Sequence, residues 1–359
     1  MTMSFWLQNN VMLLEKSNFF FKKLLEHIAK NNSLPSVEGP RLHDKKLFHI
    51  NSSLPLLRYS LSVLGPKIIN KFITKALSSN VNRWSIAYAA HNDFSKSLWR
   101  YKEIENPKGR FLADPFVFEK DGETYIFLED FFYSDNKGRI SVVKIDEDRY
   151  EFLGVVLEED FHLSFPFILE NKGDIFMVPE TIGSNDIRLY KCTEFPMKWT
   201  LEKVLMENVS AADTMFTFKD EKWFMLTNIC SSGVEDFEDY QSELHIFYSA
   251  DLKSNEWHPI KQGNPVIFDC LSARNGGLFY RDNVLYRVNQ VPGKNHYGKS
   301  FGVNKVTKLN TESYSEERIS NINSDFKLGI QSTHHYNANE KFAVVDYCRL
   351  QRQRRAIKT

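Results

Sequence analysis

Three acidic residues stand in strongly apolar stretches of the sequence, where a carboxylate is unexpected. Asp114 lies in FLADPFVF, Glu180 ends IFMVPE, and Asp213 lies in SAADTMFTF. Burial of an unpaired carboxylate is costly, so acids of this kind usually mark ion pairs or functional sites. Glycosidic-bond chemistry needs such groups, because one carboxyl moves a proton at an oxygen while another stabilises or attacks the anomeric carbon. We therefore take Asp114, Glu180 and Asp213 as candidate catalytic residues.

Polar side chains that could hold sugar hydroxyls or a phosphate are spread over the same part of the chain. Arginines and amides can donate hydrogen bonds to hydroxyls, and a histidine can orient a phosphate or move a proton. An ion pair, or exposure at the end of a strand, could also explain any one of them. The Gly276-Gly277 pair predicts a close approach of the backbone to the ligand. The candidate substrate-binding residues are Arg110, Asp130, His162, Arg274, Asn275, Arg287, Gln290 and His334.

Other chemistries have little support in the sequence. A His/Asp metal site could be assembled, but no spacing such as HExxH supports it, so we expect neither a metal nor another cofactor. We find no GxGxxG, GxxxxGK[ST] or GxSxG motif. The 46 basic and 46 acidic residues cancel, so no net field favours nucleic acid. The 4 cysteines form no CxxC pair, which argues against a zinc ribbon and favours a reducing compartment.

The elements that must position these residues form a repeat. A strand, a polar turn and a second strand recur about every 50 residues, a period typical of propeller blades. The five copies begin ADPFVFEKDGETYIF, SFPFILENKGDIFMV, ADTMFTFKDEKWFML, ARNGGLFYRDNVLYR and STHHYNANEKFAVVD. Third and fourth strands follow in most copies. We therefore predict an all-β fold, a five-bladed β-propeller over residues 83–348 with its ligand in the central funnel.

The fifth copy ends at Tyr347, too early for its outer strands. Two upstream segments, Trp84–His91 and Leu98–Ile104, could supply them and close the ring. Because the first strand of each blade lines the channel, the starts of these strands should converge on one site. Aligned by the repeat, those starts are Asp114, Phe165, Asp213, Asn275 and His334, and the second strands end at Glu129-Asp130, Glu180, Asn228, Gln290 and Asp346.

The first 82 residues are predicted to be a separate helical extension. Apolar residues recur at helical spacing between Val11 and Lys30, and a basic stretch, Leu56–Leu77, is helical except at Pro66. These helices could pack on the propeller or lie on an anionic membrane face, and the basic tail 349–359 fits either reading or solvated disorder. With neither a signal-peptide pattern nor a membrane span, we expect a cytoplasmic protein, peripheral to the inner face of the membrane.

The order of ADPFVF, HLSFPF, MVPET, AADTMF, SARNGG and YRVNQ resembles the propeller region of the glucosamine inositolphosphorylceramide transferase family and its bacterial surface-polysaccharide relatives. The five-bladed glycoside hydrolases of the arabinanase, invertase and levansucrase type are similar more distantly. That kinship implies Asp114 as base or nucleophile, Asp213 as transition-state stabiliser and Glu180 as acid. In those hydrolases, however, the acid follows the second aspartate, whereas Glu180 precedes Asp213.

These observations favour a carbohydrate-active enzyme of surface-polysaccharide or glycolipid biosynthesis. Our leading hypothesis is a glycosyltransferase that takes a carbohydrate or nucleotide-sugar substrate, and a glycolipid acceptor, in the funnel. In the family that the chain resembles, a separate glycosyltransferase domain can accompany the propeller, and the roughly 80 residues outside the repeat are too few for one. The alternatives are a glycosidase or transglycosidase that uses Asp114 with Glu180 or Asp213, and a non-catalytic glycan-binding propeller.

Overall fold

The protein is represented by a computed structural model that describes residues 6–34, scattered positions between 57 and 69, and residues 80–90, 98–230, 239–293 and 296–352. The chain divides into two compact units. The larger, Asn82–Gly233 with Glu238–Gln351, consists mainly of strands. The smaller contains the helix α1 (Trp6–Asn31).

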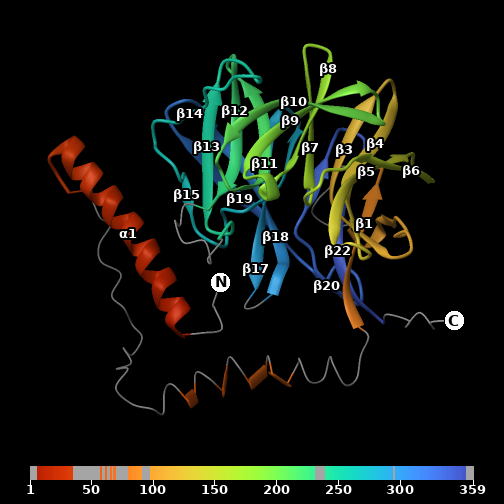
Figure 1. Ribbon diagram of the computed structural model, residues 1–359, viewed down its shortest axis with the longest axis horizontal. Coiled ribbons are helices and arrows are strands. Elements are labelled where there is room, and N and C mark those ends of the chain that lie inside the picture. The colour runs from red at the N-terminus through yellow and green to blue at the C-terminus, as the bar shows by residue number, and fades with distance from the viewer. Residues whose placement is uncertain are drawn as a thin grey trace. The chain divides into compact units, whose positions relative to one another are not determined.

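Five sheets make up the larger unit, and each is one blade (Figure 1). Blade one contains β3 (Arg110–Lys120), β4 (Glu123–Phe132), β5 (Lys137–Ile145) and β6 (Tyr150–Leu157). Blade two contains β7 (Ser164–Asn171), β8 (Asp174–Glu180), β9 (Asp186–Glu194) and β10 (Lys198–Glu207), with a 3₁₀ turn η2 (Ile182–Ser184) after β8. Blade three contains β11 (Ala211–Lys219), β12 (Lys222–Ile229), β13 (Glu243–Ser249), β14 (His258–Pro259) and β15 (Ile267–Phe268). Blade four contains β16 (Asn275–Arg281), β17 (Val284–Gly293), β18 (His296–Leu309) and β19 (Tyr314–Asn323).

Blade five is assembled from both ends of the propeller sequence. It contains β1 (Asn80–Ala89), β2 (Lys102–Glu103), β20 (Ile330–Ser332), β21 (Tyr336–Ala338) and β22 (Ala343–Arg352). Strand β1 lies between β2 and β22, so the predicted closure by upstream strands is confirmed. The predicted strand Leu98–Ile104 is wrong in part, because its first residues form a 3₁₀ turn η1 (Leu98–Arg100). Leu98 in this turn and Tyr101 directly after it are both buried, since residues three apart lie on one side of a 3₁₀ helix.

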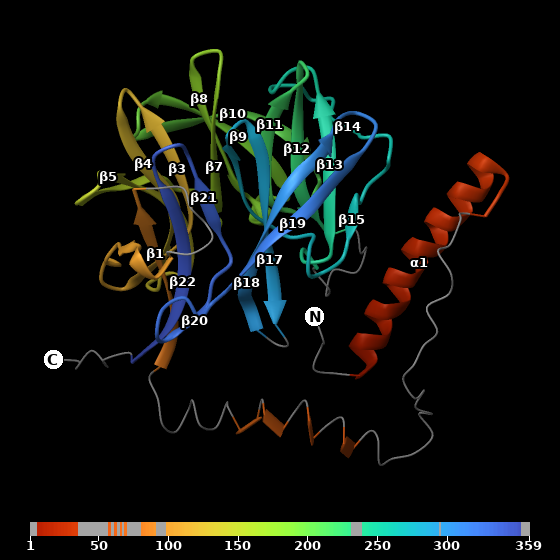
Figure 2. The same ribbon diagram turned by 180° about the vertical axis from the view of Figure 1, so that it is seen from behind.

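The inner strands close into a ring. Strand β3 contacts β7, β7 contacts β11, β11 contacts β16, β16 contacts β21, and β21 contacts β3. Figure 2 shows the same sheets from behind, with β21 of the last blade near β3 of the first. A closed ring of five sheets is a five-bladed β-propeller, so the predicted all-β fold is confirmed.

The hairpin turns follow from local sequence. A two-residue hairpin turn of type I′ needs positive φ at both central residues, which Gly, Asn and Asp adopt most readily. The predicted turn signals meet this requirement, with positive φ at Asp121-Gly122, Lys172-Gly173 and Asp282-Asn283. These tight turns keep the first two strands of each blade in register, and that register determines which side chains face the centre.

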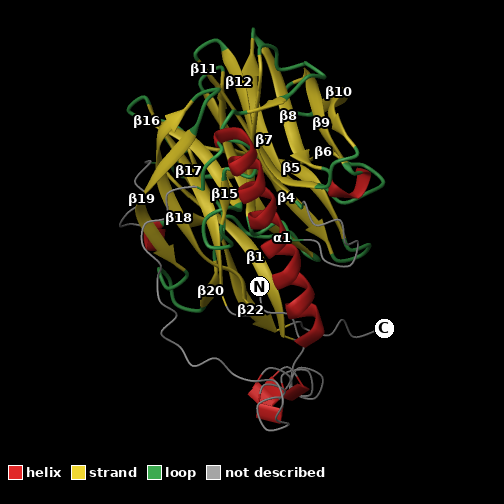
Figure 3. Cartoon of the chain, turned by 90° about the vertical axis from the view of Figure 1, so that its left-hand side faces the viewer, coloured by secondary structure: helices red, strands yellow, loops and turns green. Residues whose placement is uncertain are grey.

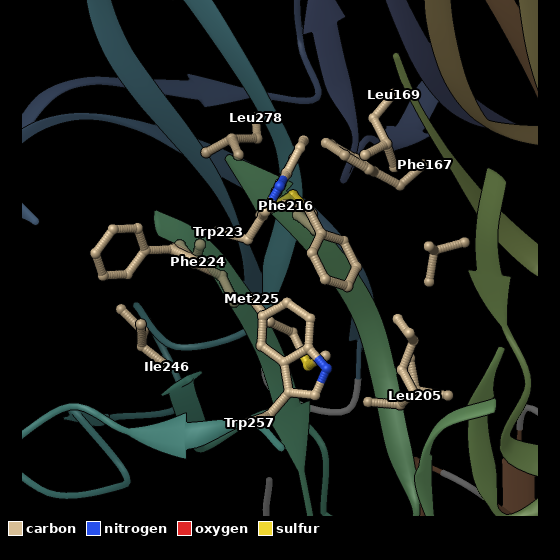
Figure 4. Close-up of a cluster of buried hydrophobic side chains, with 14 of the residues drawn as sticks. Phe167, Leu169, Leu205, Phe216, Trp223, Phe224, Met225, Ile246, Trp257 and Leu278 are labelled. Carbon is tan, nitrogen blue, oxygen red and sulfur yellow. The ribbon is translucent and has the colours of Figure 1, made fainter. Parts of the chain in front are cut away.

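Apolar side chains fill the spaces between neighbouring blades. The largest cluster joins blades two, three and four and includes Phe116 of blade one, and Figure 4 shows it around Phe216, Trp257 and Phe167. The Phe216 ring meets the Trp257 ring edge to face, with 5.6 Å between centroids. Three further clusters join blades four and five, blades one and two, and blades five and one. The aromatic-rich composition therefore serves mainly to pack blade against blade.

The predicted first helix is present as α1, drawn in red in Figure 3. The predicted second helix, Leu56–Leu77, falls largely outside the described residues, so the predicted helical extension of residues 1–82 is not established. In the part of the chain that the structure describes, no helix is long and apolar enough to cross a membrane.

Two glycines bring blade four against the backbone of blade five. A Cβ at Gly276 would lie 2.4 Å from the His334 carbonyl oxygen, and one at Gly277 would lie 2.0 Å from that of Tyr336. The predicted close approach is therefore real, but the structure shows it to be an approach to a neighbouring blade, and no ligand is needed to explain it.

We expect Gly277→Ala to destabilise the propeller, because the new methyl group would overlap backbone. The matched control is Gly154→Ala, since Gly154 also has a positive φ (117°, against 136° at Gly277) but has open space around it. Overpacking should make Gly277→Ala about 1–3 kcal/mol more destabilising than the control. Unfolding in guanidinium chloride, followed by tryptophan fluorescence, measures the difference. Equal destabilisation by the two variants would show that blade five can move away from the new methyl group without cost.

Candidate functional site

The inner residues of the first three blades share a rare backbone conformation. Asp114, Phe165 and Asp213 have φ of 49°, 47° and 50°, in the left-handed region that non-glycine residues seldom adopt. Each lies where the register between the first two strands shifts. Such strain costs about 1–3 kcal/mol per residue and clusters at functional sites. The shift turns each side chain out of the ladder at the same level of the ring.

Side chains at the ends of the second strands connect each blade to the next. The Asp213 N–H donates to Glu180 Oε2 (3.3 Å), and the Asn275 N–H donates to Asn228 Oδ1 (2.8 Å). In the same way, the Asp114 N–H donates to Asp346 Oδ2 (3.4 Å). These bonds draw the inner residue of one blade toward the polar strand end of the previous blade. The ring therefore brings together the acids that the repeat places far apart in sequence.

Asp213 is the most fully bonded of the three candidate catalytic residues. Its Oδ2 accepts hydrogen bonds from Arg274 Nε (2.7 Å) and Gln290 Nε2 (3.1 Å). Among the described residues, neither Nη atom of Arg274 has a hydrogen-bond partner. The Arg274 guanidinium also lies over the Tyr297 ring, 5.5 Å from its centroid. Asp213 thus holds an arginine whose remaining N–H groups can bind an anionic or hydroxyl-rich ligand.

Three further acids of the site, Glu180, Asp114 and Glu129, have raised pKa values. Burial, with repulsion from Asp213, raises the pKa of Glu180 to about 8. Burial also raises the pKa of Asp114 to about 7, against the opposing charge of His334. Glu129, which is buried near Asp114 and Glu180, has a pKa well above its ordinary value for the same reason. Near neutral pH the site therefore combines a proton donor, Glu180, with Asp114, a group that is close to its titration point.

The raised pKa of Glu180 makes stability depend on pH. The folded state holds the Glu180 proton more tightly than the unfolded state does, so its contribution is fully present below pH 4.5 and is lost as pH rises to about 8. We expect Glu180→Gln, which cannot ionise, to gain stability relative to wild type between pH 5 and pH 8. Urea unfolding at both values measures this, and a constant difference between the two proteins would contradict the burial of an unshielded carboxyl.

His334 lies between two acids and two aromatic rings. Its Nδ1 is 2.5 Å from Asp346 Oδ2, and its Nε2 is 3.7 Å from Asp114 Oδ1. Its ring stacks on Trp84, with 4.2 Å between centroids, and meets Tyr297 edge to face at 5.1 Å. The predicted site residue His334 therefore contacts the candidate catalytic residue Asp114.

Asp114, His334 and Asp346 could together offer ligand atoms to a cation, since one atom from each lies within 4.8 Å of the others. The 2.5 Å contact between His334 and Asp346 is, however, a direct ion pair. A cation could enter between these two side chains only if that contact opened. In the structure, His334 and Asp346 form a charge pair.

His162 lies at the edge of the acid cluster. Its Nδ1 accepts a hydrogen bond from the Gly138 N–H (2.9 Å), so in the neutral ring the proton is on Nε2. That Nε2 lies 3.4 Å from Glu129 Oε1. Burial lowers the pKa of His162, which favours the neutral ring. His162 is half exposed, so it can contact both the cluster and a ligand.

Four other predicted substrate-binding residues have internal partners. Arg110 Nη1 donates to Asp130 Oδ2 (2.8 Å), which also accepts from Ser141 Oγ, so this pair belongs to blade one. Asn275 Nδ2 donates to the carbonyls of Asp213 and Leu226. Asn275 therefore positions Asp213 and has no free donor for a ligand. Gln290, in contrast, donates a hydrogen bond directly to the carboxylate of Asp213.

Arg287 is a correction to the prediction. It is fully buried, and its five N–H donors make five hydrogen bonds inside the protein, which leaves none for a substrate. Two of these bonds, of 2.7 and 2.6 Å, go to the carboxylate of Glu316, and one goes to Asn275 Oδ1. Arg287 therefore supports the site indirectly, through its hydrogen bond to Asn275.

Comparison with known proteins shows the family of the chain. The family described as "Glucosamine inositolphosphorylceramide transferase 1, N-terminal" matches residues 99–346, which include every candidate site residue. The chain belongs to this family. The predicted resemblance is thereby confirmed.

Two plant members of the glucosamine inositolphosphorylceramide transferase family are similar in sequence. The rice protein (Oryza sativa subsp. japonica) is 35% identical over 211 residues, 57% of this chain and 27% of the relative. The Arabidopsis thaliana protein is 35% identical over 214 residues, 58% of this chain and 27% of the relative. Both carry the name glucosamine inositolphosphorylceramide transferase 1. The chain thus spans about a quarter of the length of the curated relatives it matches.

Among solved structures, a family 117 glycoside hydrolase from Zobellia galactanivorans has a TM-score of 0.47 and 10% sequence identity, covering 76% of this chain and 92% of that chain. A GH62 α-L-arabinofuranosidase catalytic domain from Coprinopsis cinerea has a TM-score of 0.47 and 11% identity, covering 76% and 98%.

Sequence reasoning missed several residues of the site in this family member. The repeat aligned Glu129 and Asp346 at the ends of second strands, but they were not chosen as candidate site residues. Tyr297 lies in β18 of blade four, and Trp84 comes from the closing strand β1. The repeat gives no signal for these two aromatic residues, because neither lies at a repeated position.

Proposed function

We propose that this family member is a carbohydrate-active enzyme of surface-polysaccharide or glycolipid assembly, a glycosyltransferase that acts in the propeller funnel. The observation that carries the proposal is the cluster of Asp114, Glu180 and Asp213 with Arg274 at the inner ends of the blades. The relatives' name, glucosamine inositolphosphorylceramide transferase 1, supports sugar transfer over other carbohydrate chemistry.

Each side chain has a role that its surroundings support. Arg274 would bind the phosphate of a nucleotide sugar through its unpaired Nη groups, while Asp213 keeps its guanidinium in place. Asp114, near its titration point, would remove the proton of the acceptor hydroxyl. Glu180, protonated near neutral pH, would donate a proton or hydrogen bond to the leaving oxygen. The exposed face of Tyr297 would stack on a sugar ring.

Glycosidase or transglycosidase activity is the second candidate. Two carboxyls of different pKa, about 7 at Asp114 and about 8 at Glu180, suit the acid and base pair of glycosidic-bond cleavage. In this reaction the same residues would act without a nucleotide leaving group. Release of reducing sugar from a glycan, in the absence of any nucleotide sugar, distinguishes the two candidates.

The test uses the purified full chain, a panel of nucleotide sugars and membrane-extracted glycolipid acceptors, and it follows nucleotide release. We expect release from one donor that depends on acceptor and is lost in Asp114→Asn. The matched control is Asp282→Asn, because Asp282 is an exposed hairpin residue whose turn conformation suits Asn equally well. Release that persists in Asp114→Asn, or no release from any donor, would overturn the assignment.

A glycolipid acceptor would place the enzyme at a membrane surface. We propose a cytoplasmic, membrane-peripheral location, with the N-terminal helical segment and the basic tail as the contacts to anionic lipid. Sedimentation of the full chain with phosphatidylserine-containing vesicles, but not with neutral phosphatidylcholine vesicles, would support this location.

A further inference from the structure

Asp346 organises the fifth-blade side of the site through four contacts. Its Oδ1 accepts hydrogen bonds from the backbone N–H groups of His334 and His335, both at 3.0 Å. Its Oδ2 accepts the N–H of Asp114 (3.4 Å) and contacts Nδ1 of His334 (2.5 Å). Asp346 is completely buried, so these contacts replace its hydration. The carboxylate therefore fixes both the imidazole of His334 and the backbone of Asp114.

This arrangement leaves His334 one orientation. With Nδ1 on Asp346, the opposite ring nitrogen Nε2 faces Asp114 Oδ1 at 3.7 Å. Trp84 stacks on one face of the imidazole, and a Cβ at Gly298 would lie 3.1 Å from the His334 Cβ. Rotation of the ring away from Asp114 would break the Asp346 contact and the Trp84 stack together.

We propose that His334 is a positioning residue, an imidazolium that Asp346 holds against Asp114 so that this carboxyl is ionised and available as the base of the reaction. The role of Asp114 as a base rests on the proposed function. The contacts that join Asp346, His334 and Asp114 do not, because they come from the geometry alone.

The charges around His334 support a protonated ring. Burial alone would lower its pKa, but Asp346 and Asp114 raise the pKa of His334 above its ordinary value, against the opposing charge of Arg274. His334 in turn lowers the pKa of Asp346. Burial lowers the pKa of the adjacent His335 to about 3, so His335 is neutral. Tyr297 presents its ring to the imidazole and can stabilise a cation.

The first test needs no substrate. Histidine ring signals of the full chain, labelled with ¹³C at Cε1, are followed by NMR from pH 5 to pH 9, and His334→Gln assigns the His334 signal. We expect the wild-type signal to titrate above the ordinary histidine range, and Asp346→Asn to lower its midpoint by about 1 pH unit or more. Asn at 346 can still accept the two backbone N–H bonds, so the variant should fold. Asp114→Asn should lower the midpoint by a smaller amount.

Two outcomes overturn the proposal: a His334 midpoint near 6.5 that does not respond to Asp346→Asn, or a signal that titrates only after divalent cations are removed with EDTA. Neither depends on finding a turnover, so failure here is distinct from failure of the proposed function.

Where the Asp114-dependent reaction is measured, a second test follows. Loss of the imidazolium in His334→Gln should raise the pKa of Asp114 and move the acid limb of the kcat/KM profile to higher pH, so that the loss relative to wild type is largest at acidic pH and becomes smaller toward pH 8. An equal loss at every pH would show a merely structural role and overturn the proposal.

Discussion

Replacing Glu180 with Gln is expected to reduce the rate of glycosyl transfer by about 10²–10⁴-fold, the range for loss of one general acid, without unfolding the propeller. The reason is that burial and Asp213 keep Glu180 protonated near neutral pH, so the side chain can deliver a proton that Gln does not have. Initial rates of nucleotide release at pH 7, with the donor and acceptor found for wild type, measure the loss.

The stability of Glu180→Gln follows from its hydrogen bonds. Glu180 Oε1 accepts from Ser164 Oγ (3.0 Å), and Oε2 accepts from the Asp213 N–H (3.3 Å). Gln has the shape of a protonated Glu, and its single carbonyl oxygen can keep one of these bonds. Loss of the other should cost about 1 kcal/mol, too little to unfold a protein of this size.

The matched control is Glu317→Gln, because Glu317 is an exposed glutamate of the outer strand β19. We expect it to keep the wild-type rate. Full activity in Glu180→Gln would contradict a role as proton donor and leave Glu180 only as a connection between blades two and three. A lost rate together with a loss of stability well beyond about 1 kcal/mol would also fail to support the acid role.

The sequence repeat predicted both the fold and the position of the site along the propeller axis, and the reason is physical. A blade cannot bury both faces alone, so its pattern must recur, and residues at one repeated position must reach one level of the ring. Asp114, Asp213 and His334 were found in this way. The same alignment selected Phe165, which shares the left-handed conformation but packs its ring against Phe116 and His335.

The ion-pair partners of the site residues could not be predicted, because they depend on how the strands and blades are aligned in three dimensions. Nothing in the sequence distinguishes Arg274, which pairs with Asp213 in the site, from Arg287, which pairs with Glu316 behind it. Both lie in blade four near aligned strand positions. The structure separates them by burial, since Arg287 has no exposed surface.

Replacing Arg287 with Met is expected to lower the free energy of unfolding by about 3–5 kcal/mol, because it leaves the carboxylate of Glu316 buried without its partner. The carbonyl of Ser272 loses its donor as well, and the carbonyl of Ala273 keeps only the bond from Asn228 Nδ2. Asn275 Oδ1 also loses a bond, so the residue that holds the Asp213 backbone becomes less fixed. Guanidinium unfolding of the purified full chain measures the loss.

Two further variants isolate the cause of this expected loss. Lys261→Met removes an exposed ion pair with Glu312 (2.8 Å), which should contribute no more than about 1 kcal/mol. The double variant Arg287→Met/Glu316→Gln removes both charges, so it should recover part of the stability lost in Arg287→Met. If the single and double variants were equally unstable, the lost carbonyl bonds, and not the unpaired carboxylate, would be the dominant effect. If Arg287→Met were as stable as Lys261→Met, the buried pair would contribute nothing, and Asp213 would need another explanation for its fixed position.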